Sequence, residues 1–305
     1  MSLSSIPPVT KLSSRVIRIL GLNPGSFTLQ GTNTYLVGTG KQRMLIDTGD
    51  GREEYLNLLA SVLEEQNVAI YKILITHWHP DHSGGLDPIL KKYPQSSIQV
   101  FKKTFQSQDE EYYCHLTDIE FKNSEAKPIS VEGATVIPIS TPGHTSDHLS
   151  FYFVEEGVLF SGDCILGLGS TIFEDLSVYM ASLKKLLAMF PPIKHIYPGH
   201  GPAVIDGKSK VIQYIKHRQE REDAIVNILK SEPPSEVKSP KYFNDQPAYS
   251  STDLVGIMYT DYPDSVLRQA QHSVTLHLKK LLVDEKVRQV ELPGICKEAY
   301  WQWCF

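Results

Sequence analysis

The chain has 305 residues, enough for one large α/β domain and a smaller module. No run approaches the roughly 18 to 20 consecutive apolar residues that a membrane-spanning helix needs, so we expect no membrane span. The formal net charge of −5 gives no overall positive field of the kind that marks strongly basic nucleic-acid-binding proteins.

Strand and helix patterns alternate through the first two thirds of the chain. The helical spacing of Leu56, Leu59, Ala60 and Leu63 predicts a helix over 53–66. Further helices are expected at 84–93 and 178–190. Expected strands cover 15–20, 34–37, 44–47, 70–76, 98–101, 135–140, 149–154, 158–161 and 193–197. This order predicts an α/β (α+β) fold class.

The pattern changes after residue 207. A long helix with a charged middle is expected over 208–230, and a Pro/Ser-rich linker follows. Helices are expected at 251–259, capped by Ser251 or Thr252, and at 265–282, before a turn and a strand over 283–290. We therefore expect a catalytic domain over residues 1–207 and a C-terminal helical, winged-helix-like domain over 208–305.

Seven candidate metal ligands lie on loops that follow expected strands. Three imidazoles and a carboxylate fall within six residues, and three later candidates each follow a glycine. Zinc prefers imidazole nitrogen and carboxylate oxygen, and loops at one edge of stacked sheets can converge. The candidates are His77, His79, Asp81, His82, His144, Asp163 and His200.

These motifs resemble the metallo-β-lactamase superfamily over roughly residues 15–205. The resemblance implies a four-layer αββα sandwich and two zinc ions, with other divalent metals as alternatives. It implies one metal on His77, His79 and His144, and a second on Asp81, His82 and His200. Asp163 would bridge them, and Asp47, in the Asp-Thr-Gly segment, would orient the ligands through hydrogen bonds.

A hydroxide that bridges the two metals is the expected nucleophile. Asp81 would hold the attacking water and shuttle its proton. We expect His148 to contribute to substrate or leaving-group chemistry, although it also fits a histidine that merely begins a strand. Asn33 is a candidate substrate contact and equally a turn residue. Cys164 has no partnered base in the sequence, so we expect it to pack rather than react.

Nearly the whole chain further resembles a group of mitochondrial endoribonucleases within this superfamily. The shared features are Gly31–Val37, Thr141–Thr145 with Asp147-His148, His217-Arg218 with Arg221-Glu222, and Leu276–Leu281. The resemblance implies cleavage of single-stranded RNA in the mitochondrial matrix, with the cytosol as the alternative location. Lys216, Arg218 and Arg221 could contact phosphates, or could form a solvated face with internal ion pairs.

Two other functions stay open. A thioesterase like glyoxalase II shares the same ligands, but it would need a C-terminal region that holds glutathione. A binding module that kept its metals and lost catalysis would be expected to lack some ligands, whereas every one is present. No obligate protein partner is evident, and the expected partner is the RNA substrate. The four cysteines show no close pairing, which predicts free thiols.

Overall fold

The computed structural model describes residues 4–94, 97–103, 116–122, 125–234, 241–260, 264–291 and 299–304. The chain divides into two compact units, Met1–Glu174 with Val178–Tyr214, and Asp175–Ser177 with Ile215–Phe305. This division falls within a helix, seven residues after the expected domain boundary at 207. Cys164 and Cys304 are free thiols. Cys114 and Cys296 lie outside the described residues.

The first sheet of unit 1 has seven strands in sequence order. Strands β1 to β4 pair antiparallel, and β4 to β7 pair parallel. Their bounds are β1 Val9–Lys11, β2 Val16–Leu20, β3 Asn33–Val37, β4 Gln42–Ile46, β5 Ala69–Leu74, β6 Gln99–Lys102 and β7 Leu116–Asp118.

The second sheet of unit 1 has five strands, β10 to β14, again in sequence order. The pairs are antiparallel except β13 with β14, which is parallel. The bounds are β10 Ile129–Val131, β11 Ala134–Ser140, β12 Leu149–Phe153, β13 Val158–Gly162 and β14 His195–Pro198. A separate two-stranded sheet joins β8 (Phe121–Lys122) to β9 (Glu125–Ala126).

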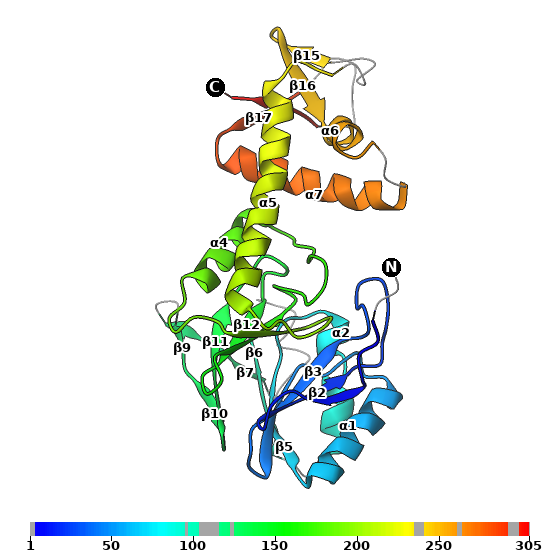
Figure 1. Ribbon diagram of the computed structural model, residues 1–305, viewed down its shortest axis with the longest axis vertical. Coiled ribbons are helices and arrows are strands. Elements are labelled where there is room, and N and C mark those ends of the chain that lie inside the picture. Colours follow the sequence, from blue (N-terminus) through cyan, green and yellow to red (C-terminus); the bar gives the residue numbers. More distant parts are fainter. Residues whose placement is uncertain are drawn as a thin grey trace. The chain divides into compact units, whose positions relative to one another are not determined.

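The alternation of side chains along the strands builds the layers of unit 1. In β4, Met44 and Ile46 enter the core between the two sheets, while Leu45 faces the helices. The helices on that outer face are α1 (Glu53–Gln66) and α3 (Leu86–Lys92), and the short α2 (Pro80–Ser83) precedes α3 (Figure 1).

The second sheet has its own helical layer. Tyr179 of α4 (Leu176–Leu187) donates to the Cys164 carbonyl just after β13, and Gly207 at the start of α5 (Gly207–Lys230) lies against Ile196 of β14. The order helix, sheet, sheet, helix is the four-layer αββα sandwich that the motifs predict. No helix in the described residues is long and apolar enough to cross a membrane.

Unit 2 packs helices against a four-stranded sheet in the order β15-β16-β18-β17 (Figure 1). Its apolar core joins the end of α5 to both following helices and to Trp301. The remaining elements are β15 Lys241–Phe243, β16 Gln246–Ser250, α6 Ser251–Met258, α7 Asp264–Val283, β17 Val287–Val290 and β18 Tyr300–Trp303.

Unit 2 differs from the expectation in the cap of α6 and in its strands. The cap of α6 is Ser250 rather than Ser251 or Thr252, because the Ser250 hydroxyl accepts from the Asp253 amide while Asp253 bonds back to Ser250. The sequence also did not predict β15, β16 or β18, and β18 lies in the middle of the sheet between β16 and β17. Strands this short carry too weak a pattern to be found without their partners.

A buried ion pair joins α5 to α7 within unit 2. Lys280 Nζ lies 3.0 and 2.9 Å from the two carboxylate oxygens of Glu222, and 2.7 Å from Asp284. Burial alone would raise the pKa of Glu222, but His277 and Lys280 outweigh it and hold the pKa at about 2. Because this is below the ordinary 4.5, the ionised Glu222 stabilises unit 2 above pH 4.5 and loses that contribution as the pH falls toward 2.

The variant Lys280→Met should destabilise unit 2 at pH 7 by about 3 kcal/mol, because it leaves the Glu222 carboxylate buried without its cation. Urea denaturation followed by tryptophan fluorescence measures this loss. The double variant Glu222→Gln/Lys280→Met removes both charges and should recover most of it. Equal stability of the wild type and Lys280→Met would contradict the buried ion pair.

Candidate metal centre

The seven candidate ligands come from four loops at one edge of the two sheets of unit 1. His77 and His79 follow β5, and Asp81 and His82 lie on the adjoining α2. The other three follow later strands: His144 after β11, Asp163 after β13 and His200 after β14. The strands that precede the loops are buried and hydrogen-bonded, so they hold the loops in place.

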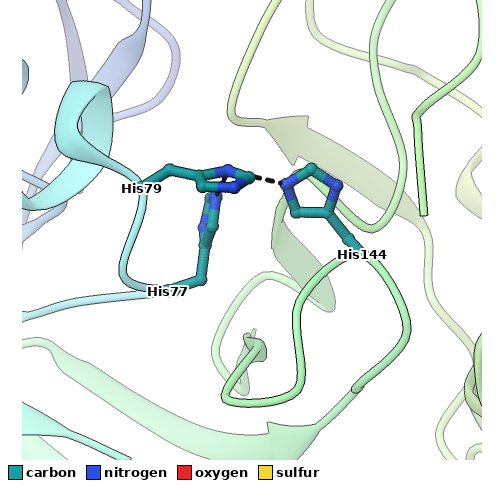
Figure 2. A group of neighbouring side chains, drawn as sticks. All are labelled: His77, His79 and His144. Atoms are coloured by element: carbon teal, nitrogen blue, oxygen red, sulfur yellow. Dashed lines mark hydrogen bonds between the residues drawn. The ribbon is translucent and has the colours of Figure 1, made fainter. Parts of the chain in front are cut away.

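The first group of ligand atoms is formed by His77, His79 and His144. His79 Nδ1 lies 2.9 Å from His77 Nε2 and 3.0 Å from His144 Nε2. Figure 2 shows the His144 ring facing the other two from a separate loop. His77 is fully buried, whereas His79 is half-buried, so the group is open to solvent on the His79 side.

The second group is formed by Asp81, His82 and His200. Asp81 Oδ2 lies 3.3 Å from His82 Nε2 and 3.2 Å from His200 Nε2, and the two imidazole nitrogens are 3.2 Å apart. The three ligand atoms therefore form a nearly equilateral triangle. Both imidazoles are buried, while the Asp81 side chain is 25% exposed.

Asp163 lies between the two groups. Its carboxylate oxygens are 3.4 Å from His82 Nε2, 3.3 Å from His200 Nε2 and 3.7 Å from His144 Nε2. The loop that carries His200 passes close to Asp163 and requires a glycine at position 199. A Cβ there would collide with the Asp163 carboxylate and the His82 ring. Among the described residues, Asp163 Oδ1 is a buried acceptor with no hydrogen bond, which leaves it available to a cation.

The geometry of both groups fits tetrahedral cation sites. Zinc bonds of about 2.0–2.1 Å at the tetrahedral angle place ligand atoms about 3.3–3.4 Å apart. The second triangle matches that spacing, and the contacts of the first group are a few tenths of an ångström shorter. Within the described part of the chain, three sets of ligand atoms could hold a metal: His77/His79/His144, His77/His82/Asp163 and Asp81/His82/His200.

The charges of the centre favour bound cations as well. Burial lowers the pKa of His77 well below its usual value, which keeps the imidazole in the neutral form that binds metal. Burial would also lower the pKa of His200, but Asp163 and Asp81 outweigh it and raise the pKa to about 9. The two carboxylates thus attract positive charge to the centre.

Asp47 orients His82 of the second group through a hydrogen bond. One carboxylate oxygen accepts from the Thr76 amide at 2.8 Å, and the other accepts from the Thr76 hydroxyl at 2.9 Å and from His82 Nδ1 at 2.8 Å. The bond to Nδ1 leaves Nε2 of His82 without a proton and directed at the centre. Asp47 itself adopts a φ of 58°, a conformation that aspartate tolerates better than most residues.

Two further supports were not found by sequence reasoning. The Thr32 hydroxyl donates to Asp81 Oδ2 at 3.0 Å, and Asn23 donates to Thr32 in turn at 3.0 Å. The Ile172 carbonyl accepts from His144 Nδ1 at 2.7 Å. Thr32 lies next to Asn33 in the Gly31–Val37 segment. The contact of Thr32 with Asp81, 49 residues later, is visible only in the folded structure.

His148 differs from its expected role in substrate chemistry. It is fully buried, and its Nε2 accepts from the Asp163 amide at 3.1 Å. Nδ1 of His148 therefore carries the proton and donates it to the Thr141 hydroxyl at 2.9 Å. The Thr141 hydroxyl then donates to the Ser150 hydroxyl at 3.0 Å, which in turn donates to the Ser161 carbonyl at 3.3 Å. This chain of hydrogen bonds makes His148 a positioning residue for Asp163.

Asn33 is likewise a support rather than an open substrate contact. Its side-chain amide donates to the carbonyls of Pro198 and Gly201, both at 2.9 Å, on either side of His200. Asn33 is buried, so it holds the loop of His200 in place. Cys164 packs as expected, because burial raises the pKa of its thiol to about 12 and keeps it protonated.

The three basic residues expected to bind phosphate all lie in unit 2 and form no open cationic face. Arg218 is buried on the stripe of α5 that also buries Glu222, and the Arg221 guanidinium lies 4.9 Å from the ring centre of Tyr259. Lys216 is exposed and pairs with Glu220 at 3.6 Å. Both sequence interpretations of Arg218, a phosphate contact and a solvated ion pair, placed it at the surface, whereas the structure buries it.

The variant Asp47→Asn should weaken metal binding at the second group by about tenfold to a hundredfold. An amide nitrogen beside Nδ1 of His82 would force the proton onto Nε2, where it opposes a cation. Competition with a coloured chelator measures both affinities, and the first group serves as the internal control. Unchanged affinity at both sites would contradict the orienting role.

The variant His148→Leu removes the acceptor of the Asp163 amide and should lower the bound metal from two ions toward one per chain. His148→Gln restores an acceptor oxygen and should recover part of the metal content, which elemental analysis of dialysed protein measures. Full metal content in His148→Leu, in a folded protein, would show that Asp163 does not depend on His148.

Comparisons with known proteins agree with the fold. Residues 27–200 match the model of the metallo-beta-lactamase superfamily, and residues 250–295 match a beta-lactamase associated winged helix domain. The second match confirms the winged-helix interpretation of unit 2.

Three known proteins illustrate the similarity. A beta-lactamase-like protein 2 homolog of Caenorhabditis elegans is 43% identical, over 93% of this chain and 89% of that protein. An atrochrysone carboxyl ACP thioesterase of Passalora fulva is 38% identical, over 75% and 66% respectively. The fold also matches a beta-lactamase domain protein from Burkholderia ambifaria, with a TM-score of 0.75 at 15% identity, over 97% and 93%. The chain belongs to the metallo-β-lactamase superfamily.

Proposed function

We propose that this protein is a zinc-dependent endoribonuclease that hydrolyses phosphodiester bonds of single-stranded RNA. The observation that carries hydrolysis is the pair of ligand groups joined by Asp163, a complete donor set for two cations. Members of this superfamily are typically metal-dependent hydrolases. RNA as the substrate is proposed from the resemblance of nearly the whole chain to the mitochondrial endoribonuclease group, and the beta-lactamase-like protein 2 homolog aligns with 93% of this chain.

In this proposal His77, His79 and His144 would hold one zinc ion, and Asp81, His82 and His200 the other, with Asp163 shared. When bound, two such cations would lower the pKa of a water molecule to about 7 and offset charge on the attacked group. Thr32 fixes Asp81 through Oδ2, and among the described residues no hydrogen bond reaches Oδ1. Asp81 Oδ1 can therefore accept a proton from the attacking water.

A thioesterase is the second candidate. One relative at 38% identity is named as a carboxyl ACP thioesterase, and the donor set suits an ester-like carbonyl as well as a phosphorus atom. A metal-binding module without catalysis is the third candidate, and the completeness of the ligand set argues against it. The mitochondrial location stays a prediction from the resemblance.

The test is a parallel panel of substrates on one sample of zinc-loaded protein. The panel holds labelled single-stranded RNA, S-lactoylglutathione, an acyl-carrier-protein thioester and nitrocefin, each with a chelator-treated control. We expect RNA cleavage that a chelator abolishes and added zinc restores. Turnover of a thioester alone would overturn the ribonuclease in favour of the thioesterase, and no turnover at full metal content would favour the binding module.

The variant Asp81→Ala should lower the rate of hydrolysis about 10²- to 10⁴-fold, because the attacking water loses its proton acceptor and the second cation loses a ligand. Circular dichroism should show a folded protein, since Asp81 is partly exposed and outside the apolar core. Glu65→Ala, at an exposed acid on α1, is the matched control and should keep full activity. Near-normal turnover by Asp81→Ala would contradict the assignment.

A further inference from the structure

Two lysines of unit 1 converge on Ser140, the last residue of β11. Lys103 Nζ donates to the Ser140 hydroxyl at 3.4 Å and to the Ser146 carbonyl at 3.4 Å. Lys185 Nζ donates to the Ser140 carbonyl at 3.3 Å. Lys103 follows β6 and Lys185 lies in the last turn of α4, so the fold brings together two cations from distant parts of the sequence.

Among the residues that the structure describes, the charge of this pair is not balanced by a carboxylate. Across the described ranges, no carboxylate lies within ion-pair distance of Lys103 or Lys185, whereas the neighbouring Lys102 is 4.0 Å from Asp147. Burial and the charge of Lys103 both lower the pKa of Lys185. Serine oxygens carry only partial negative charge, so a bound anion would relieve the repulsion between the two ammonium groups.

The lysine pair contacts a loop of the metal centre. Ser140 and Ser146 stand four residues before and two residues after His144, on the loop that carries this ligand into the first group. Two residues of extended chain span at most about 7 Å, so Ser146 is held close to His144. An anion at the lysine pair would therefore contact the loop that supplies His144 to the metal centre.

We propose that Lys103 and Lys185 form a subsite for a phosphate of the RNA strand beside the bond that is cleaved. The inference rests on the proposed ribonuclease function and names the part of the surface that would hold the strand. An RNA strand carries a phosphate at every nucleotide, so a phosphate is available to the two lysines whichever bond is cleaved. In this proposal the two lysines bind the phosphate that the sequence analysis assigned to Lys216, Arg218 and Arg221, which form no open cationic face.

Binding to RNA measures the subsite without cleavage. Metal-free protein is titrated into a fluorescent single-stranded RNA 10-mer, and anisotropy gives the Kd at several salt concentrations. The double variant Lys103→Gln/Lys185→Gln should bind about threefold to tenfold more weakly at low salt. The slope of log Kd against log salt should fall by about 0.7 to 1 for the lost phosphate contact.

Three controls make the result specific. Lys91→Gln, at an exposed lysine of α3, should change neither Kd nor slope. Lys103→Arg/Lys185→Arg keeps the charges and should recover binding. In the zinc-loaded protein the glutamine variant should raise the KM for RNA and leave the kcat and the metal content unchanged, because neither lysine is a ligand.

The outcomes separate the subsite from the function. If the wild type cleaves RNA but the glutamine variant keeps its Kd and salt slope, the subsite is wrong and the ribonuclease stands. If the wild type neither binds nor cleaves RNA, both are wrong. If the variant instead raises the KM of the acyl-carrier-protein thioester, whose phosphopantetheine arm also carries a phosphodiester, the lysines serve a thioesterase and the RNA assignment is overturned.

Discussion

The catalytic unit depends on one buried carboxylate, Asp163, which must remain ionised among imidazoles from three other loops. Burying an ion away from water is costly unless it is paired and hydrogen-bonded. Its oxygens lie within 3.7 Å of three imidazole nitrogens, and its own amide is held by His148. The second sheet supplies that support, because the chain of hydrogen bonds from His148 runs through residues of β12 and β13. The position of Asp163 is thus set by the backbone of the sandwich.

The same principle applies to those other ligands that have a hydrogen bond to a rigid element. Asp47 holds His82, Thr32 holds Asp81, and the Ile172 carbonyl holds His144. These supports select the tautomer and direction of each ligand before any cation binds, which lowers the reorganisation that binding would otherwise require. The partly exposed His79 and Asp81 leave one side of the centre open, which gives the proposed substrate a route to it.

The sequence predicted features that depend on local pattern. Helix α1 spans the expected 53–66, and the seven candidate ligands come together because each follows a strongly apolar strand. Features that depend on distant partners were not predicted. The role of His148 follows from the pairing of β11 with β12, and the burial of Arg218 and Glu222 follows from the packing of unit 2, where Lys280 compensates the charge of Glu222. The convergence of Lys103 and Lys185 on Ser140, 37 and 45 residues away, has no signal in either local sequence.

The central claim is that two cations share Asp163 between the two ligand groups. Anomalous diffraction at the zinc absorption edge, from crystals of the zinc-loaded protein, tests it most directly. We expect two anomalous peaks, one bonded to His77, His79 and His144 and one to Asp81, His82 and His200, with Asp163 in contact with both. A single peak, or peaks that avoid Asp163, would contradict it.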